Sequence, residues 1–315
     1  MISRREFVAA NVMGFVSVLS AADTSIAAES AIPIIETHTH FYDPTRPVGV
    51  PWPAKSEALL YRPVLPAEFK ALTKPFGITG TIIVEASPWL EDNQWLLDLA
   101  QNDPFIVGIV GNLSPGTDLF AQQLSRFAKN PLFRGIRISA TAIHQQIDQQ
   151  QFVSDLKRMV DHDLELDVNG GPEMSLLVDQ LAQKLPQLRI VINHLANLKI
   201  DGQSPPLSWK GDLKSAAKHQ NVYLKVSALV ESARVNGKAV PQNLSHYRPV
   251  LQAAWETFGV DRLIFGSNWP VSDLAAPYGT VFHIVSEFFQ EQGADAIEKF
   301  FARNAQEAYR WKIRR

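Results

Sequence analysis

Three histidines stand where strand-like runs of the sequence end, and histidine is the side chain best suited to proton transfer or metal binding near neutral pH. His38 and His40 close the run 33–41, and His194 follows the apolar run 190–192. Spacing of two residues on a strand puts the first two imidazoles on one face, about 7 Å apart. The pair therefore suits one divalent metal or one anion-binding patch, and His194 suits either catalysis or a core hydrogen bond.

Two charged residues and one small-residue segment are further candidates. Glu85 ends the run 83–86, where a carboxylate can ligate a metal, hold a substrate hydroxyl or bridge to Arg137. Arg137 can clamp a substrate carboxylate with two hydrogen bonds or form an ion pair within the protein. Residues 265–270 read Phe-Gly-Ser-Asn-Trp-Pro. The small residues of this segment permit a close approach of neighbouring groups, and its Trp-Pro pair forms a rigid turn. We expect Trp269 to contact substrate.

The other histidines have weaker claims to the chemistry. His162 and His219 end predicted helices, where a cation favours the helix dipole, and His283 lies in a late helix. His144 and His246 lie in or near long predicted loops, and we expect His144 to bind substrate.

A regular alternation of strand-like and helical stretches must position these residues. Amphipathic helical segments separate the strand candidates, and no Gly/Ser-rich linker divides the chain. Eight β-then-α units of this kind predict one (β/α)8 TIM barrel, an α/β fold, with extra C-terminal helix near 280–291 and 294–311. The strand candidates are 33–41, 79–86, 105–111, 133–139, 164–169, 189–195, 222–228 and 262–267.

Polar residues alternate with apolar ones along several of these strands, which places the polar ones on one face. Because the apolar face can pack on helices, the polar face is predicted to point into the barrel, where Lys225 would pair with Asp167 or Glu165. Active sites of such barrels lie at the carboxyl ends of the strands. Long connections are expected at that end: 42–66, 140–148, 196–207 and 229–244.

Composition excludes several classes of protein. The net charge of -2 and the absence of Lys/Arg runs give no reason to expect a nucleic-acid partner. The chain has no cysteine, which excludes disulfides, thiolate catalysis and Cys-ligated metal sites. Any metal must therefore be held by His, Asp or Glu side chains, or by a modified residue.

The first residues have the order of an export signal. Arg4 and Arg5 precede a weakly hydrophobic stretch, and Ser25-Ile26-Ala27 supplies a small-x-small cleavage signal. A membrane anchor or a disordered tail is the alternative, but the apolar stretch is short for a span of about 20 residues. We therefore expect a twin-arginine signal peptide over 1–27, a barrel domain over 28–315, a periplasmic location and no membrane span in the mature form.

With these motifs in order, the chain resembles the amidohydrolase superfamily, in its amidohydrolase-related branch. The resemblance covers the whole mature chain and includes His38–Phe41, Gly80–Ala86, Phe133–Arg137, His194 and Phe265–Pro270. That branch includes sugar lactonases, muconolactone-type hydrolases, pyrone-dicarboxylate lactonases and some decarboxylases. The resemblance implies hydrolysis of a small carbonyl compound, a lactone or cyclic ester, by attack of an activated water.

The resemblance also implies a site, from which this sequence departs at one position. His38, His40 and His194 would hold one divalent metal, most plausibly zinc, although some members of the branch work without metal. The residue after strand eight is usually an Asp that acts as base, and here it is Asn268. An amide accepts no proton, so we expect Glu85, or else His194, to activate water, with Asn268 holding the water or a substrate hydroxyl. An anionic substrate paired with Arg137 would fit.

Two other functions remain open at this point. A decarboxylase on the same barrel also needs the Asp that Asn268 replaces. A non-catalytic barrel that binds a sugar-like or aromatic acid in the periplasm does not need that Asp.

Overall fold

The computed structural model describes residues 33–235 and 238–314, which belong to one compact unit, Ile32–Arg315. The predicted signal peptide over 1–27 lies outside the described residues. Within them, no helix combines the length and the apolar character that a membrane span requires.

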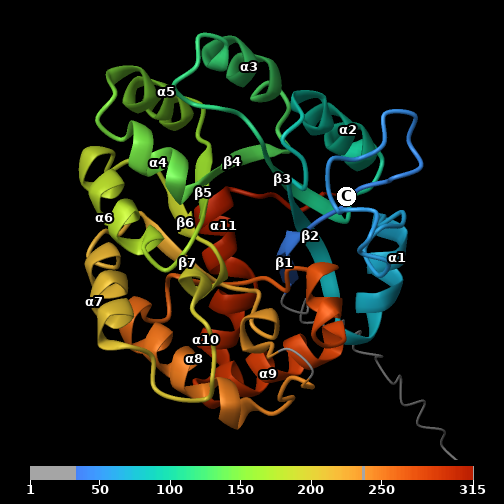
Figure 1. Cartoon of the computed structure of the whole chain (residues 1–315), viewed down its shortest axis with the longest axis vertical. Coiled ribbons are helices and arrows are strands. Elements are labelled where there is room, and N and C mark those ends of the chain that lie inside the picture. Colours follow the sequence, from blue (N-terminus) through green and yellow to red (C-terminus); the bar gives the residue numbers. More distant parts are fainter. Residues whose placement is uncertain (1–32, 236–237, 315) are drawn as a thin grey trace, which may run out of the picture. The chain divides into compact units, whose positions relative to one another are not determined.

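Eight parallel strands form the centre of the unit, each paired with the next along the chain (Figure 1). Past the last strand, the chain runs alongside the first again, where Asn268 N donates to His38 O at 2.9 Å and Thr39 forms a bridge with Trp269. The ring of strands therefore closes, as the sequence predicted. The strands are β1 (Ile34–Thr39), β2 (Ile78–Val84), β3 (Ile106–Gly111), β4 (Phe133–Ser139), β5 (Glu165–Asn169), β6 (Ile190–Ile192), β7 (Val222–Val226) and β8 (Leu263–Phe265).

Helices follow the strands and surround them (Figure 1). They are α1 (Pro66–Thr73), α2 (Leu90–Gln101), α3 (Phe120–Phe127), α4 (Ala140–Gln146), α5 (Gln150–Asp161), α6 (Met174–Lys184), α7 (Leu207–Ala216), α8 (Leu244–Phe258), α9 (Tyr278–Glu291), α10 (Ala294–Glu298) and α11 (Asn304–Tyr309). Helix α4 replaces part of the long loop expected over 140–148. Ser139 begins it, because its hydroxyl accepts from Ala142 N at 3.1 Å and caps the first turn.

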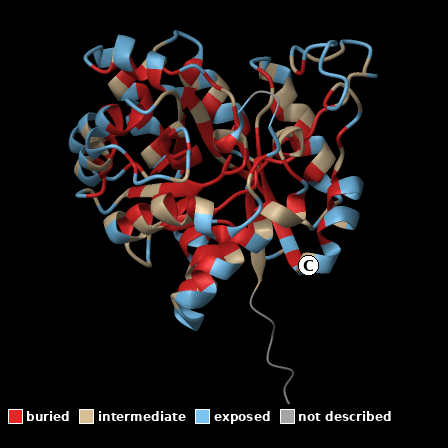
Figure 2. Ribbon diagram, turned by 60° about the horizontal axis from the view of Figure 1, so that its bottom comes forward, coloured by how far each residue is buried: buried red, intermediate tan, exposed pale blue. Residues whose placement is uncertain are grey.

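Two apolar layers hold the barrel together, and Figure 2 shows the buried residues concentrated along its strands. The outer layer joins the strands to the surrounding helices. The inner layer consists of Ile35, Val107, Val191 and other inward strand residues, and α11 packs against it through residues such as Tyr309. The extra C-terminal helix therefore closes one end of the barrel, which leaves the opposite end for the site.

A buried ion pair crosses the barrel interior, as the alternation of polar residues predicted. Lys225 Nζ donates to Asp167 Oδ2 at 2.8 Å, and Tyr309 donates to the other oxygen of Asp167 at 2.8 Å. Lys225 and Asp167 are fully buried, and such charges are tolerated only when paired and hydrogen-bonded. Glu165 lies nearby, and burial raises the pKa of its carboxyl well above the usual value.

Candidate functional site

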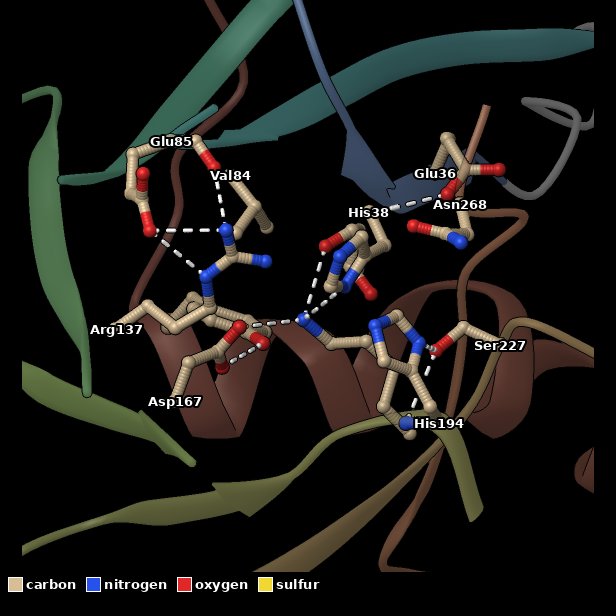
Figure 3. A network of polar contacts seen from close by, with 12 residues as sticks. Glu36, His38, Val84, Glu85, Arg137, Asp167, His194, Ser227 and Asn268 are labelled. Carbon is tan, nitrogen blue, oxygen red and sulfur yellow. Dashed lines mark hydrogen bonds and ion pairs between the residues drawn. The ribbon is translucent and has the colours of Figure 1, made fainter. Parts of the chain in front are cut away.

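Three histidines and one asparagine meet at the carboxyl end of the strands. Figure 3 shows His38, His194 and Asn268 there. His38 and His40 come from the end of β1, His194 follows β6 and Asn268 follows β8. The ring of His38 lies 5.0 Å from that of His40 and 4.4 Å from that of His194, centroid to centroid. The structure therefore brings together His38, His40, His194 and Asn268, which the sequence places at strand ends.

The side chain of Glu36 holds this cluster in place by joining β1 to the segment after β8. Glu36 Oε1 accepts from His38 N and from Ser267 N, both at 2.8 Å, so one buried carboxylate ties the two segments together. Burial raises the pKa of Glu36 to about 7 despite these hydrogen bonds. Gly266 permits the close approach, because a Cβ there would lie 2.9 Å from His38 Cβ.

Lys225 determines which ring nitrogen of His38 carries the proton. The ammonium has three hydrogens and three acceptors: Asp167 Oδ2 at 2.8 Å, Thr37 O at 3.1 Å and His38 Nδ1 at 3.3 Å. An ammonium only donates, so Nδ1 accepts and neutral His38 carries its proton on Nε2. Burial, with the charge of Lys225, lowers the pKa of His38 well below the usual value, which keeps the ring neutral. Its Nε2 is buried and has no partner among the described residues.

His40 carries its proton on the other ring nitrogen, Nδ1. Its Nδ1 lies 2.9 Å from Val84 O, and a carbonyl only accepts, so the proton is on Nδ1. Burial lowers the pKa of His40 to about 3. Neutral His40 therefore turns the lone pair of Nε2 toward Asn268 Oδ1, 3.2 Å away.

His194 is a second hydrogen-bond donor. Ser227 Oγ accepts from His194 N at 3.3 Å and lies 2.8 Å from His194 Nδ1 (Figure 3). Ser227 Oγ already accepts from His194 N, so its hydroxyl hydrogen can be donated to Nδ1, and this arrangement leaves the proton of neutral His194 on Nε2. Burial lowers the pKa of His194 well below the usual value. The residue adopts a φ of 57°, a left-handed conformation that orders the turn after β6.

These proton positions do not suit the predicted three-histidine metal centre. A metal ligand must offer a lone pair, and Lys225 leaves none at His38 Nε2. Among residues 33–235 and 238–314, no group of three or more His, Asp or Glu side chains is arranged to hold a metal ion. The histidines lie together as expected, but the buried ammonium of Lys225 beside His38 adds a positive charge that disfavours a second cation in the cluster.

The expected base, Glu85, is already bound on both oxygens. Its Oε1 accepts from Arg137 Nε at 2.9 Å and its Oε2 accepts from Ser87 N at 2.8 Å. Arg137 also donates to Glu85 O at 2.8 Å, and Figure 3 shows the two side chains against each other. Both oxygens of Glu85 are thus already engaged by protein donors. The structure therefore favours the bridging role for Glu85 over the role of base.

A polar pocket of about 420 Å³ opens beside this ion pair. It contains hydrogen-bonding groups of several kinds, with few charges beyond the pair itself. Its polar lining comes from Glu85, Asn112, Ser114, Arg137, Ser139, Gln146 and Asn169. Such a lining suits a small molecule with several hydroxyl groups.

Two residues expected to bind substrate are placed elsewhere. His144 is exposed on α4 and is not among the residues that line the polar pocket, because it faces away while Gln146 faces in. Trp269 is fully buried, with its ring 4.9 Å from that of Phe69 and 6.2 Å from that of Phe41. The ring of Trp269 packs in the apolar core and does not reach the pocket.

Sequence reasoning missed one carboxylate next to Asn268. Asn268 Nδ2 donates to Glu231 Oε1 at 2.8 Å, and Glu231 lies in the short helical turn Glu231–Ala233 after β7. A signal was available, because Glu231 is the one carboxylate in the long connection 229–244. Ser227 and Lys225, which place the protons of the histidines, were also not assigned to the site.

Comparison with known proteins agrees with this architecture. The family model described as amidohydrolase matches residues 35–311. The chain belongs to the amidohydrolase family. It is 32% identical over 248 residues to an L-fucono-1,5-lactonase of Burkholderia ambifaria, covering 78% of this chain and 83% of that protein.

Solved structures of low sequence identity share the fold. An amidohydrolase from Burkholderia multivorans with bound HEPES is 23% identical, with a TM-score of 0.80 over 89% of this chain and 100% of that one. A second structure of a Burkholderia multivorans amidohydrolase contains zinc, at a TM-score of 0.78, 23% identity and the same coverage. A dihydroxybenzoic acid decarboxylase from Polaromonas is 15% identical, with a TM-score of 0.59 over 88% of this chain and 97% of that one.

Proposed function

We propose that this protein hydrolyses a small hydroxylated lactone and that its own side chains carry out the proton transfers. The observation that supports the proposal most is that the Nδ1 atoms of two histidines in the cluster face different partners, a carbonyl oxygen for His40 and a hydroxyl for His194. His194 offers an N–H and His40 offers a lone pair. Both rings are largely buried, with 6% and 5% of their surface exposed. Hydrolysis of a carbonyl compound needs one donor and one acceptor of this kind.

The reaction follows from these positions. His194 Nε2–H donates to the lactone carbonyl oxygen, and His40 Nε2 takes a proton from a water as its oxygen bonds to the carbonyl carbon. The tetrahedral intermediate then collapses, and the ring C–O bond breaks. The leaving alkoxide takes the proton back from His40, which gives the open-chain hydroxy acid and regenerates the neutral imidazole.

The polar pocket supports a sugar-type lactone as substrate. Its amide and hydroxyl groups, such as Asn112 and Asn169, match substrate hydroxyls. Arg137 already neutralises Glu85, so the pocket has no unpaired positive charge to favour an anion. A neutral polyhydroxylated lactone is therefore the better fit than the anionic substrate that the sequence suggested. The relative from Burkholderia ambifaria, named for a lactone of a sugar acid, supports the same class.

The proposal is tested with a panel of sugar-acid lactones and with a metal chelator. We expect turnover of 1,5- or 1,4-lactones of hexonic acids, unchanged after dialysis against chelator, and no metal in elemental analysis. Wild-type protein that opens none of these lactones would refute lactone hydrolysis. Activity lost to chelator and restored by zinc would refute the metal-independent mechanism.

Decarboxylation is the second function that the fold allows. It requires a proton to be delivered to the ring carbon that loses carboxylate, and the resemblance implies an Asp after strand eight for this step. Asn268 occupies that position, and the neutral pocket has no free cation for a substrate carboxylate. Lactone hydrolysis is therefore preferred, and the same screen with hydroxybenzoates distinguishes the two.

We also propose that the chain is exported by the twin-arginine route and acts in the periplasm. The ordered Arg4-Arg5, apolar stretch and Ser25-Ile26-Ala27 support this. Replacing Arg4 and Arg5 by lysine should retain the precursor in the cytoplasm. Normal export of the double variant would show that the route is different.

A further inference from the structure

Asn268 leaves the site one carboxylate short, and the structure brings another to the same place. Asn268 Nδ2 donates to Glu231 Oε1 at 2.8 Å, while Asn268 Oδ1 lies 3.2 Å from His40 Nε2. The three side chains thus form one chain of contacts, His40–Asn268–Glu231. It runs from the buried side chains of His40 and Asn268, which are 5% and 7% exposed, to the half-buried Glu231.

The direction of this chain is fixed by Glu231. An ionised carboxylate only accepts hydrogen bonds, so it holds the amide with nitrogen inward and oxygen toward His40. The other oxygen, Glu231 Oε2, is buried without a partner among the described residues. Among the described residues no cation is hydrogen-bonded to this carboxylate, in contrast to Glu85 and Asp167, and Asn268 is the side chain that donates to it.

The arrangement matches the protonated form of His40 better than the resting form. Neutral His40 turns a lone pair toward Asn268 Oδ1, and two acceptors that face each other gain nothing. Once His40 Nε2 has taken a proton from water, the same geometry becomes a hydrogen bond from imidazolium to amide, with a carboxylate behind it. Contacts that form only after proton transfer accelerate the reaction.

We propose that Glu231 is a positioning residue that acts through Asn268, and that the two together replace the single carboxylate expected after strand eight. Glu231 orients the amide and supplies the negative charge that stabilises protonated His40. It does not touch substrate. The inference rests on the proposed lactone hydrolysis for its catalytic part, and on the observed contact between Glu231 and Asn268 for its structural part.

Exchanging the amide and the carboxylate tests the proposal. Glu231→Gln loses the charge and the fixed amide orientation, and Asn268→Asp places two carboxylates in contact. We expect each single variant to lower kcat by about 10²-fold, with KM little changed, because misplaced catalytic groups cost about that much. The Glu231→Gln/Asn268→Asp double variant again has one carboxylate and one amide. It should recover at least about tenfold over either single variant.

The pH profile gives a second readout. Burial raises the pKa of Glu231 to about 7. The ionised form is the one that orients Asn268, so kcat should rise as pH increases through this range, and Glu231→Gln should lose the rise. The other charged or titratable groups that influence this carboxyl are Asp273, which raises its pKa, Arg234, which lowers it, and Tyr247.

Three outcomes would overturn the inference. Full kcat in Glu231→Gln, or a double variant no better than the singles, would show that Glu231 has no role in turnover. If the wild-type protein opens no lactone, the proposed function fails. Thermal melting at pH 8 then tests the contact between Glu231 and Asn268 by itself. Asn268→Asp should lower the melting temperature when Glu231 is present and leave it unchanged in the Glu231→Gln background. Equal melting shifts in both backgrounds would overturn the inference without reference to activity.

Discussion

Two carboxylates flank the histidine cluster, and their surroundings differ in one respect. Glu85, on the β2 side, is held by the guanidinium of Arg137 and by Ser87 N. Glu231, on the β7 side, accepts from the neutral amide of Asn268 and has an oxygen without a hydrogen-bond partner among the described residues. Glu85 is thus held in an ion pair beside the polar pocket, whereas Glu231 is linked through Asn268 to His40.

Under the proposed mechanism, this difference divides the site into a binding side and a proton-transfer side. The polar pocket opens next to Glu85 and Arg137, so loss of either should weaken substrate binding. His40, Asn268 and Glu231 lie on the other side, where changes should affect kcat. His194 stands beside His38 between the two. The following predictions are ordered from the largest expected effect to the smallest.

Removing the donor on His194 should have the largest effect. His194→Phe keeps an aromatic ring but removes the N–H that the mechanism directs at the carbonyl oxygen. Loss of one such donor costs about 10²–10³-fold in kcat. Ser227→Ala is the matched control, because it keeps the ring and removes only the hydroxyl that places the proton on Nε2, so its loss should be smaller. Equal kcat in wild type and His194→Phe would show that a group other than His194 stabilises the oxyanion.

Arg137→Met should raise KM and change kcat little. The substitution removes the cation beside the pocket and leaves Glu85 unpaired, and a hydrogen bond to a charged group contributes about 1.5–3 kcal/mol, or about 10–10²-fold in KM. Arg126→Met is the control, because Arg126 forms an ion pair with Glu91 on the surface. A loss confined to kcat would contradict the division of the site.

The fold could be predicted from the sequence almost completely, because strand periodicity and strand-end polarity are local signals. The buried pair of Lys225 and Asp167 followed from the alternation of polar residues, which requires partners inside a barrel. Helix α4 was mistaken for part of a loop, because its start depends on a single cap, Ser139.

The site was predictable as a list of strand-end residues, but not as a set of proton positions. Which nitrogen of His38 carries the proton is decided by Lys225, 187 positions away in the chain. Trp269 was placed in the site because it follows Asn268, although its ring packs into the core. Glu231 was missed because its partner lies 37 positions away. Tertiary contacts of this kind have no local signature.

The smallest expected effect distinguishes two residues on the same helix. His144 and Gln146 both lie on α4, but Gln146 lines the polar pocket, whereas His144 is exposed to solvent. His144→Ala should leave kcat and KM unchanged, since an exposed substitution away from the site rarely alters stability by more than about 0.5 kcal/mol. Gln146→Ala is the paired variant and should raise KM a few-fold by removing an amide that can bind a substrate hydroxyl. Both variants retain the cap at Ser139 that begins α4, so a difference between their KM values is due to the substituted side chain. A rise in KM for His144→Ala equal to that for Gln146→Ala would show that substrate extends beyond the polar pocket to the outer face of α4.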